Sequence, residues 1–411
     1  MQTYLVGGAV RDQLLGLPVK ERDWVVVGGS VQQMLDQGFR KVGKDFPVFL
    51  HPVSGEEYAL ARTERKKGPG YYGFDVHAAA DVTLEQDLLR RDLTINAIAQ
   101  DENQLLTDPY GGQRDLEQRL LRHVSPAFSE DPLRVLRVAR FLARLAPLGF
   151  RIAPETSQLM SDLAASGELE NLVPERVWQE TETALGEAQP QLYFQALRDC
   201  GALRHLFPEL DALYGIPQPA RWHPEVDTGL HSLMVLAQAA KLSDDPCVRF
   251  AALVHDLGKA ATPRDLWPSH PGHERRSVQL ILAMVQRLKI PNQYRDLAVK
   301  VAELHGKCHN IAELRDSTVL AMLEALDSFR RPRMLEDFLL ACEADARGRT
   351  DREDEPYPQA ELLRQAHQAA ASVNAGDQDL AGLTGEQIGA LLRQERLRAI
   401  ARQRLASENS D

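Results

Sequence analysis

Two carboxylates stand two residues apart immediately before an apolar run. Glu21 and Asp23 precede the segment WVVVG, whose β-branched residues predict a buried strand over residues 23–28. Side chains at positions i and i+2 of a strand project to the same side. Two adjacent carboxylates are costly unless a cation lies between them, and Mg²⁺ prefers oxygen ligands. The pair therefore predicts a magnesium site suited to phosphoryl chemistry, with an ordinary charged turn as the alternative.

A pair of glycines lies between a predicted strand and a predicted helix. Residues 3–6 are expected to form the strand and residues 9–16 the helix, with GGAVRD over residues 7–12 at the junction. Glycine lets the backbone approach a phosphate closely, and a helix N-terminus favours an anion. Gly8 and Arg11 are therefore candidates for binding a triphosphate, although a plain tight turn would have the same sequence.

Two further segments carry arginines. The segment RRDLTINA over residues 90–97 has an arginine pair that could clamp phosphate or ribose; the alternative is a helix start with Asp92 near its cap. The segment EDPLRVLRVAR over residues 130–140 has a charged residue at every third position. These residues are Asp131, Arg134, Arg137 and Arg140. On a helix they form one ridge, which is either a nucleotide-binding face or a solvated basic face.

The later part of the chain contains most of the histidines. His255 and Asp256 are adjacent at the end of an apolar helical segment, FAALVHDLGK. A single such pair is usually structural, but several more histidines on successive predicted helices are less easily explained in that way. Imidazole and carboxylate together suit a transition metal such as nickel, manganese or cobalt. The candidate ligands are His231, His255, Asp256, His273, His305 and Asp345.

The elements that would position these residues change in kind along the chain. The first hundred residues alternate strands and helices, an α/β pattern. A mobile loop is predicted at residues 64–76, where charges, glycines and a proline gather. Beyond residue 115 the pattern is helical, and it stays helical over residues 228–345. Amphipathic helices are expected in the last fifty residues.

Composition limits the class of protein. A chain of 411 residues exceeds one ordinary core, so about two to four domains are expected. No apolar run approaches the roughly 20 residues of a membrane span, and the N-terminus lacks a secretory signal. The net charge of −11 argues against a generic nucleic-acid binder, but a local basic face could still bind phosphate. Four cysteines without CxxC spacing argue against a zinc ribbon or a disulfide scaffold and favour the cytoplasm.

The N-terminal motifs together resemble the polymerase-β-like nucleotidyltransferase superfamily, and more narrowly the bacterial class II CCA-adding enzymes and the related bacterial poly(A) polymerases. The family pattern GGxVRD, a DxD-type pair, RRDxTxNA and EDxxRxxR appears here as GGAVRD, ERD, RRDLTINA and EDPLRVLR. The resemblance implies that Glu21 and Asp23 hold magnesium during catalysis. It also implies nucleotide contacts for Gly8, Arg11, Arg91, Arg137 and Arg140. Glu21 departs from the usual aspartate, which is one methylene shorter.

By the same resemblance, Asp131 and Arg134 select the incoming base. Cytosine and adenine each carry an exocyclic amino donor next to a ring-nitrogen acceptor. Asp131 can accept from the amino group, and Arg134 can donate to the ring nitrogen. A bidentate match of this kind discriminates by on the order of 1–3 kcal/mol.

The histidine set resembles the HD phosphohydrolase superfamily, with its H…HD…D pattern. An HD domain joined to a CCA-adding head marks one bacterial subgroup. The resemblance implies that this subgroup also hydrolyses 2′,3′-cyclic phosphates, 2′-nucleotides and other phosphate esters. Such hydrolysis would turn a damaged 3′ end into the free hydroxyl that nucleotide addition requires. A degenerate HD fold that serves only as a tRNA-binding body is the alternative.

The expectation for the whole chain is an α+β protein in four parts. These are a polymerase-β-like head with a mixed sheet at residues 1–140, an all-α neck that binds tRNA at residues 141–226, an all-α HD domain at residues 228–345 and a helical tail at residues 346–411. The expected partners are tRNA, CTP and ATP, with Mg²⁺ for nucleotide addition. We expect no membrane association, and a monomer or a homodimer.

Three other functions share part of these features. Bacterial poly(A) polymerases share the head motifs but typically carry a basic C-terminal extension, whereas the region after residue 345 is acidic or mixed. An HD phosphohydrolase with a catalytically weak head would require that Glu21 no longer binds metal. A non-catalytic RNA-binding protein would not be expected to retain two metal constellations. The leading interpretation is therefore completion of the tRNA 3′ end with C, C and A, without a nucleic-acid template.

Overall fold

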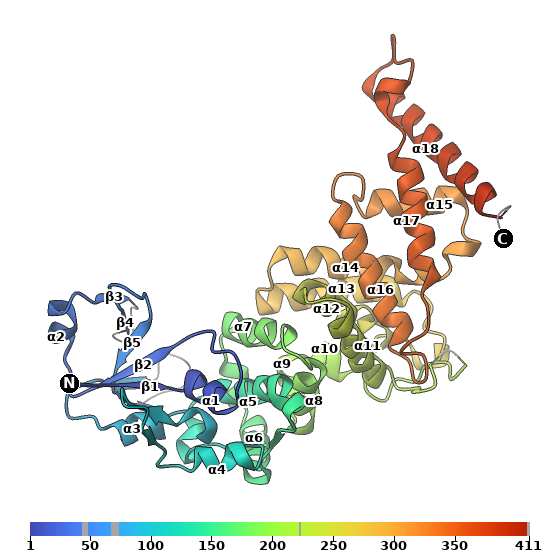
Figure 1. Ribbon diagram of the computed structural model, residues 1–411. Helices are drawn as coiled ribbons and strands as arrows, with labels where there is room; N and C mark the ends of the chain where they lie inside the picture. The colour runs from blue at the N-terminus through green and yellow to red at the C-terminus, as the bar shows by residue number, and fades with distance from the viewer. Residues whose placement is uncertain (43–47, 67–73, 222, 409–411) are drawn as a thin grey trace. The chain divides into compact units, whose positions relative to one another are not determined.

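The computed structural model describes residues 1–42, 48–66, 74–221 and 223–408. The chain divides between Leu206 and Phe207 into two compact units, which are coloured blue to green and green to red in Figure 1. The first unit begins with a mixed sheet and helices, and the chain beyond it is helical. The expected α+β class is therefore confirmed. The domain boundaries expected near residues 140, 226 and 345 stay predictions.

The sheet of the first unit has the strand order β3-β4-β5-β2-β1-β8-β9. Its strands are β1 (Gln2–Val6), β2 (Asp23–Val27), β3 (Arg40–Val42), β4 (Val48–Leu50), β5 (Glu57–Leu60), β8 (Ala99–Gln100) and β9 (Leu106–Thr107). β2 pairs in parallel with β5, and the other neighbours pair antiparallel. Val25 and Val26 of β2 belong to two separate buried clusters, because side chains alternate along a strand. β2 is thus buried on both faces, as its run of valines predicts.

Three short helices accompany this sheet. They are α1 (Gly8–Leu14), α2 (Val31–Asp36) and α3 (Leu84–Leu89). Met34 of α2 packs in the cluster that contains Val26, and Leu88 of α3 packs in the cluster that contains Val25. Because α1 follows β1 with only Gly7 between them, the glycine turn lies at the end of a central strand.

The remainder of the first unit is mainly helical. Its helices are α4 (Gly112–Glu117), α5 (Leu133–Leu145), α6 (Pro154–Ala165), α7 (Pro174–Leu185), α8 (Gln191–Asp199) and α9 (Leu203–Leu206), and a short parallel pair is formed by β10 (Leu120–Leu121) and β11 (Arg151–Ile152). α5 packs against α7 and α8. Its residues Leu136, Val138 and Ala139 are fully buried, so apolar packing fixes α5 within the first unit.

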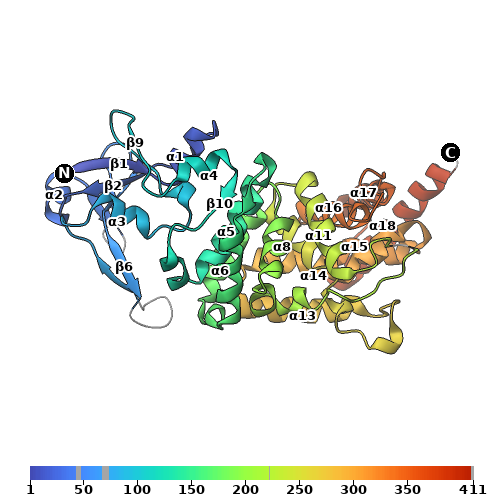
Figure 2. The ribbon, with the colours of Figure 1, turned by 90° about the horizontal axis from the view of Figure 1, so that it is seen from below.

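The second unit is built from helices. They are α10 (Pro208–Asp211), α11 (Thr228–Leu242), α12 (Pro246–Val254), α13 (His273–Leu288), α14 (Asn292–His309), α15 (Asp316–Ala325), α16 (Pro332–Arg347), α17 (Pro358–Ala371) and α18 (Gly385–Glu408). α12 packs against α11, α14 and α16, and α13 packs against α14. Figures 1 and 2 show α17 and α18 side by side at the C-terminal end. The helices around α12 carry the histidines.

The loop predicted at residues 64–76 is described only at its two ends. β6 (Thr63–Lys66) and β7 (Phe74–His77) pair antiparallel there, and residues 67–73 lie outside the described residues. Within the described part of the chain, no helix has both the length and the apolar character that crossing a membrane requires.

Candidate functional sites

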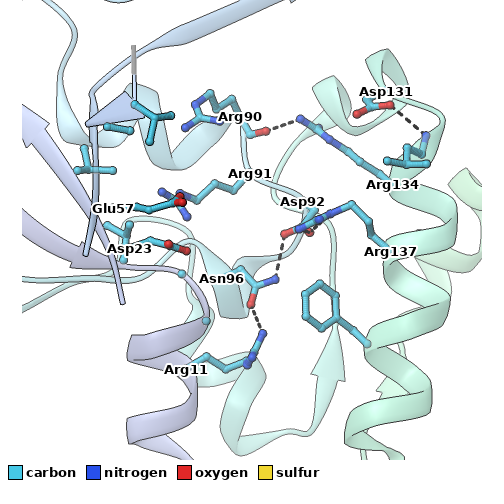
Figure 3. A pocket seen from close by; sticks show the side chains of 18 of the residues that line it. Arg11, Asp23, Glu57, Arg90, Arg91, Asp92, Asn96, Asp131, Arg134 and Arg137 are labelled. Carbon is cyan, nitrogen blue, oxygen red and sulfur yellow. Dashed lines mark hydrogen bonds and ion pairs between the residues drawn. The ribbon is translucent and has the colours of Figure 1, made fainter. Parts of the chain in front are cut away.

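The N-terminal motifs meet at one cavity of the first unit (Figure 3). The cavity has a volume of about 540 Å³, within the range of small-molecule sites. The motif residues that line it are Gly7, Gly8, Arg11, Asp23, Arg90, Arg91, Asp92, Asn96, Asp131, Arg134, Arg137 and Arg140. The charged ridge of α5 thus faces a cavity shared with the other motifs, which a solvated basic face would not require.

Asp23 supplies a carboxylate to this cavity from the first position of β2. Burial raises the pKa of Asp23, Arg91 lowers it and Glu21 raises it, so Glu21 is close enough to repel the Asp23 carboxylate. Glu21 lies just before β2, is exposed, and is not among the described residues that line the cavity. Glu57 does line it, because the parallel register of β2 and β5 places Glu57 opposite Asp23. Figure 3 shows these two carboxylates side by side, facing Arg91.

Two arginines lie beside the glycine turn. Gly7 has a φ of 71°, and a Cβ built there would come within 2.9 Å of Arg91 Nη1, so the turn requires glycine. Arg91 Nη2 donates to Asp87 Oδ2 at 3.2 Å. Arg11 Nη1 donates to Asn96 Oδ1 at 2.7 Å. Both guanidinium groups are therefore positioned by protein acceptors at the place where a phosphate would approach the turn.

The two residues expected to read the base lie on one wall of the cavity. Arg134 donates from Nη1 to the carbonyl of Ala127 at 2.9 Å, and from Nη2 to the carbonyl of Arg90. Asp131 pairs through Oδ2 with Arg176 Nη2 at 3.4 Å. Asp131 and Arg134, which are expected to hydrogen-bond to the edge of a base, bond to other protein groups in this structure. Recognition of a base would therefore replace these internal hydrogen bonds with hydrogen bonds to the base.

The other two ridge residues are held by carboxylates. Arg137 donates from Nε to Asp92 Oδ2 at 2.8 Å, and Arg140 donates from Nε to Glu180 Oε2 at 2.7 Å. Burial by itself would raise the pKa of Asp92, but Arg137 and Asn96 outweigh it and hold that pKa well below its usual range. Glu180 belongs to α7, so the ion pair between Arg140 and Glu180 connects α5 to α7 beside the cavity.

Some residues of this site were not predicted from the sequence. Glu57 lies opposite Asp23 only because of the register between β2 and β5, which the sequence does not reveal. The sequence alone predicts Asp92 only near a helix cap, yet its carboxylate pairs with Arg137. Glu180 lies 40 positions from its partner Arg140 and stands in no recognisable motif. The RRDLTINA motif contains one of these residues, and for the others the sequence offers no local signal.

Four histidines of the second unit share one hydrogen-bonding pattern. They are His231 in α11, His255 just after α12, His273 at the start of α13 and His305 in α14. Each turns Nδ1 toward a main-chain carbonyl oxygen at 2.7–3.0 Å. A carbonyl only accepts, so each Nδ1 carries a hydrogen. In the neutral ring, Nε2 then keeps a lone pair, which is the form of imidazole that binds metals.

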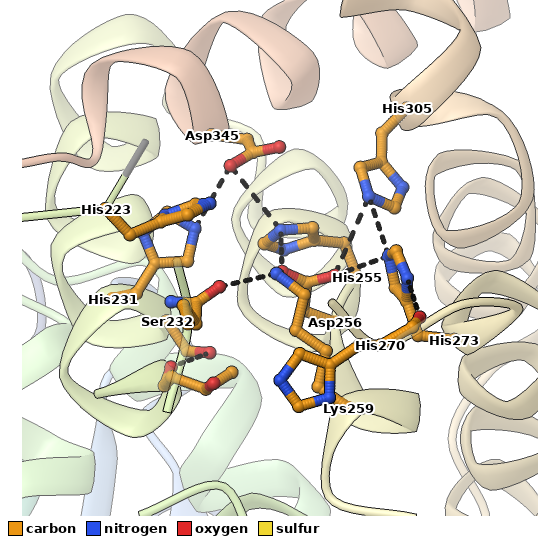
Figure 4. A network of polar contacts seen from close by, with 12 residues as sticks. His223, His231, Ser232, His255, Asp256, Lys259, His270, His273, His305 and Asp345 are labelled. Atoms are coloured by element: carbon orange, nitrogen blue, oxygen red, sulfur yellow. Dashed lines mark hydrogen bonds and ion pairs between the residues drawn. The ribbon is translucent and has the colours of Figure 1, made fainter. Parts of the chain in front are cut away.

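The four Nε2 atoms converge on Asp256 and Asp345 (Figure 4). The distance from Nε2 to the nearer carboxylate oxygen is 3.1 Å for His231, His255 and His273, and 3.6 Å for His305. All six predicted ligands therefore lie in one buried cluster. Its ligand atoms form overlapping groups of three, each group within 4.8 Å, and Asp256 belongs to two of the groups, one with His231 and one with His273.

The charges of this cluster fit a metal ion. Burial would lower the pKa of His255, but Asp256 and Asp345 outweigh it and raise that pKa to about 10. Burial lowers the pKa of His305 to about 3. His255 Nε2 and Asp256 Oδ1 each lie 3.1 Å from an ion-pair partner but make no hydrogen bond among the described residues. The two carboxylates favour a positive charge in this buried cluster, and a metal cation would supply it.

Three more residues surround the cluster and were not predicted. Glu225 Oε1 lies 3.0 Å from His231 Nδ1 and so orients that ring from behind. His309 Nε2 lies 2.6 Å from Asp345 Oδ2, and Lys259 pairs with Asp256. His309 follows a predicted ligand by one helical turn, so helical spacing could have found it. Glu225 lies before α11 in a segment without periodicity and gives no such signal.

The fold and the two sites define a nucleotidyltransferase head followed by a helical unit with an HD-type metal cluster. Comparison with protein families agrees with this class. The poly A polymerase head domain matches residues 3–122, the probable RNA and SrmB-binding site of polymerase A matches residues 149–214, and the HD domain matches residues 228–346.

Full-length relatives identify the family. The chain is 64% identical to the multifunctional CCA protein of Thioalkalivibrio sulfidiphilus over 400 residues, which cover 97% of this chain and 98% of that protein. It is 60% identical to the multifunctional CCA protein of Methylococcus capsulatus over 407 residues, which cover 99% of this chain and 96% of that protein. The chain belongs to the multifunctional CCA protein family, tRNA nucleotidyltransferases that carry an HD phosphohydrolase domain.

Solved structures share the fold. A Thermotoga maritima CCA-adding enzyme complexed with tRNA superposes with a TM-score of 0.63 at 20% identity, covering 99% of this chain and 91% of that chain. A CCA-adding enzyme complexed with ATP gives a TM-score of 0.65 at 20% identity, covering 100% of this chain and 90% of that chain. The fold of these CCA-adding enzymes therefore extends over nearly the whole chain, and the family expected from the motifs is confirmed by the full-length relatives.

Proposed function

We propose that the cavity of the first unit binds CTP or ATP and is the place where C, C and A are joined to tRNA. The observation that carries this proposal is the meeting of the glycine turn, the carboxylates and the arginine ridge around one cavity. The triphosphate would lie at Gly7 and Gly8, where main-chain amides and the start of α1 favour an anion. Arg11 and Arg91 would neutralise its charge.

Glu21 and Asp23 are proposed to hold Mg²⁺, with Glu57 as a further oxygen ligand. When bound, Mg²⁺ would help to deprotonate the 3′-hydroxyl of tRNA and neutralise the leaving pyrophosphate. The 3′ oxygen would bond to the α-phosphorus while the bond to the β-phosphate breaks. Burial and, to a lesser extent, repulsion by Glu21 raise the pKa of Asp23, and a cation would offset both effects.

Base selection is proposed to depend on Asp131 and Arg134. Asp131 would leave Arg176 and accept from the amino group of cytosine or adenine, while Arg134 would donate to the adjacent ring nitrogen. Arg137 and Arg140 would contact the nucleotide from the same helix, α5. Their carboxylate partners fix the direction of both guanidinium groups, so the ridge would be rigid before the nucleotide binds.

The cluster of the second unit is proposed to bind a transition metal and to hydrolyse phosphate esters. Its nitrogen-rich ligand set suits nickel, manganese or cobalt better than magnesium. When bound, such a metal supplies hydroxide at neutral pH. The proposed ligands are His231, His255, Asp256, His273, His305 and Asp345.

A cytoplasmic location agrees with four cysteines that are all free.

The test is incorporation of labelled CTP alone, ATP alone and both together, with magnesium, onto tRNA that ends just before CCA. We expect two C residues from CTP alone, and two C residues followed by one A from the mixture, after which synthesis stops. Long tails from ATP alone on any RNA would instead identify a poly(A) polymerase. No incorporation at all would mean that the head is inactive and that Glu21 does not replace aspartate as a ligand.

A further inference from the structure

A second cavity lies directly beside the metal cluster of the second unit. Its volume is about 560 Å³, within the range of pockets that enclose molecules of nucleotide size. His273 belongs to a ligand group and also lines the cavity, as does Lys259, which pairs with Asp256. A molecule in this cavity would therefore reach the metal ligands without any rearrangement of the helices.

Arg349 lines this cavity just beyond the end of α16. Its Nη2 lies 3.8 Å from Asp345 Oδ1, and its side chain is only 16% exposed. Its Nε is buried and has no hydrogen-bond partner in the described ranges. A buried charged donor that lacks an acceptor is costly. Arg349 thus lines the cavity with a guanidinium whose hydrogen-bonding capacity the described residues do not fully satisfy.

Two other cations of the cavity are already engaged. Lys259 pairs with Asp256 and donates to Gln218, and Arg352 Nη1 lies 3.7 Å from Glu355 Oε2. Among the described residues, the ion-pair partner of Arg349 is Asp345, at 3.8 Å. A metal ion bound to Asp345 would take up that negative charge, which would leave Arg349 without a counterion and favour an anion in the cavity.

We propose that this cavity is the substrate pocket of the HD site and that Arg349 binds the phosphate of the substrate, an inference that rests on the hydrolase function proposed above. A planar guanidinium can donate two parallel hydrogen bonds to two phosphate oxygens. The ligand class is a phosphate ester of ribose, either a free nucleotide or the terminal phosphate of an RNA strand. The sugar would occupy the rest of the cavity, near Tyr357 and Pro219.

The test measures binding of inorganic phosphate to the nickel-loaded, full-length protein by calorimetry. Arg349→Met should weaken phosphate binding about 10- to 100-fold, as expected for loss of a charge-assisted bond, and Arg349→Lys should weaken it less because the charge remains. The matched control is Arg333→Met, which removes the same charge from a side chain that is 77% exposed on α16 and outside the cavity. It should bind phosphate like the parent. Unchanged phosphate affinity in Arg349→Met would overturn the proposal.

Metal content, measured on every variant, separates phosphate binding from a structural role. Loss of metal from both Arg349 variants would show that Arg349 only supports Asp345, and would overturn the proposal. Hydrolysis is then compared for adenosine 2′-phosphate and for an RNA that ends in a phosphate. A rise in KM for both substrates in Arg349→Met is expected. A rise for one only assigns the pocket to that source. If the parent binds phosphate through Arg349 but hydrolyses neither, the proposed hydrolase function fails while the phosphate site stands.

Discussion

The two sites of this chain differ in how their charges are balanced. In the first unit, two arginines of the α5 ridge are paired with carboxylates, Arg137 with Asp92 and Arg140 with Glu180. In the second unit, the histidines use Nδ1 on main-chain carbonyls and turn Nε2 toward two carboxylates. The first site suits a charged substrate that binds and dissociates in each reaction cycle, whereas the second suits a metal cation that stays bound.

The same contrast appears in the burial of the residues proposed to bind metal. Glu21 and Asp23 are both exposed, just before and at the start of β2. A cation between them would therefore be bound weakly without the phosphates of a nucleotide. Asp256 and Asp345 are both buried, and nitrogen ligands surround them. We therefore expect magnesium to exchange readily at the first site and a transition metal to stay bound during purification at the second.

The largest effect is expected from removing the carboxylate of Asp23, which belongs to the predicted metal-binding pair and also lines the cavity. Asp23→Asn is expected to lower the rate of CTP incorporation about 1000-fold, because several kcal/mol of metal-dependent stabilisation is lost. Hydrolysis of phosphate esters should be unchanged, since the substitution lies in the other unit. Asp81→Asn, at a side chain that is 75% exposed, is the control and should behave like the parent in a single-turnover assay.

The converse variant is His255→Ala. It should abolish phosphate-ester hydrolysis and reduce bound transition metal, because His255 Nε2 faces both carboxylates of the cluster. Addition of CCA should proceed at the parental rate. Metal content by mass spectrometry and incorporation of both nucleotides are measured on one preparation, with His205→Ala as a control outside the cluster. Loss of both activities would mean that the HD region is structural.

A smaller effect is expected for base selection. Asp131→Ala should reduce the preference for CTP over UTP about 10- to 100-fold, since one bidentate match is worth on the order of 1–3 kcal/mol. The KM for CTP should change less, because the triphosphate is bound elsewhere in the cavity. Competition between labelled CTP and UTP measures the preference directly. A preference equal to that of the parent would rule out Asp131 as a residue that selects the base.

The smallest effects are expected from substitutions of Glu57 and Glu21, the two carboxylates proposed to bind magnesium together with Asp23. Glu57→Gln should slow incorporation about tenfold, equivalent to about 1.4 kcal/mol, because its carboxylate lies opposite Asp23 in the cavity. Glu21→Asp should stay within about threefold of the parent, since it keeps the charge at an exposed strand end. The dependence of both rates on magnesium concentration is the readout. A larger loss of rate in Glu21→Asp than in Glu57→Gln would show that the length of the Glu21 side chain matters more to magnesium binding than the charge of Glu57.

The sequence predicted those parts of the sites that lie in contiguous motifs. GGAVRD, RRDLTINA and EDPLRVLR each place their arginines at the cavity, because a short segment carries its own turn or helix. The six HD residues were also predicted, although His231 and Asp345 lie 114 positions apart. Residues that act through another element were missed. Glu57 depends on strand register, and Glu180 depends on how α7 packs against α5.

We propose that one chain holds two independent sites that act in succession on a tRNA end. The direct measurement offers CTP and ATP, with magnesium and nickel, to a tRNA that ends before CCA in a 2′,3′-cyclic phosphate. The parent should remove the phosphate and then add C, C and A. Asp256→Asn should leave this tRNA blocked yet extend one with a free 3′-hydroxyl, whereas Asp23→Asn should unblock it without extension. Loss of both steps through either substitution would contradict the account.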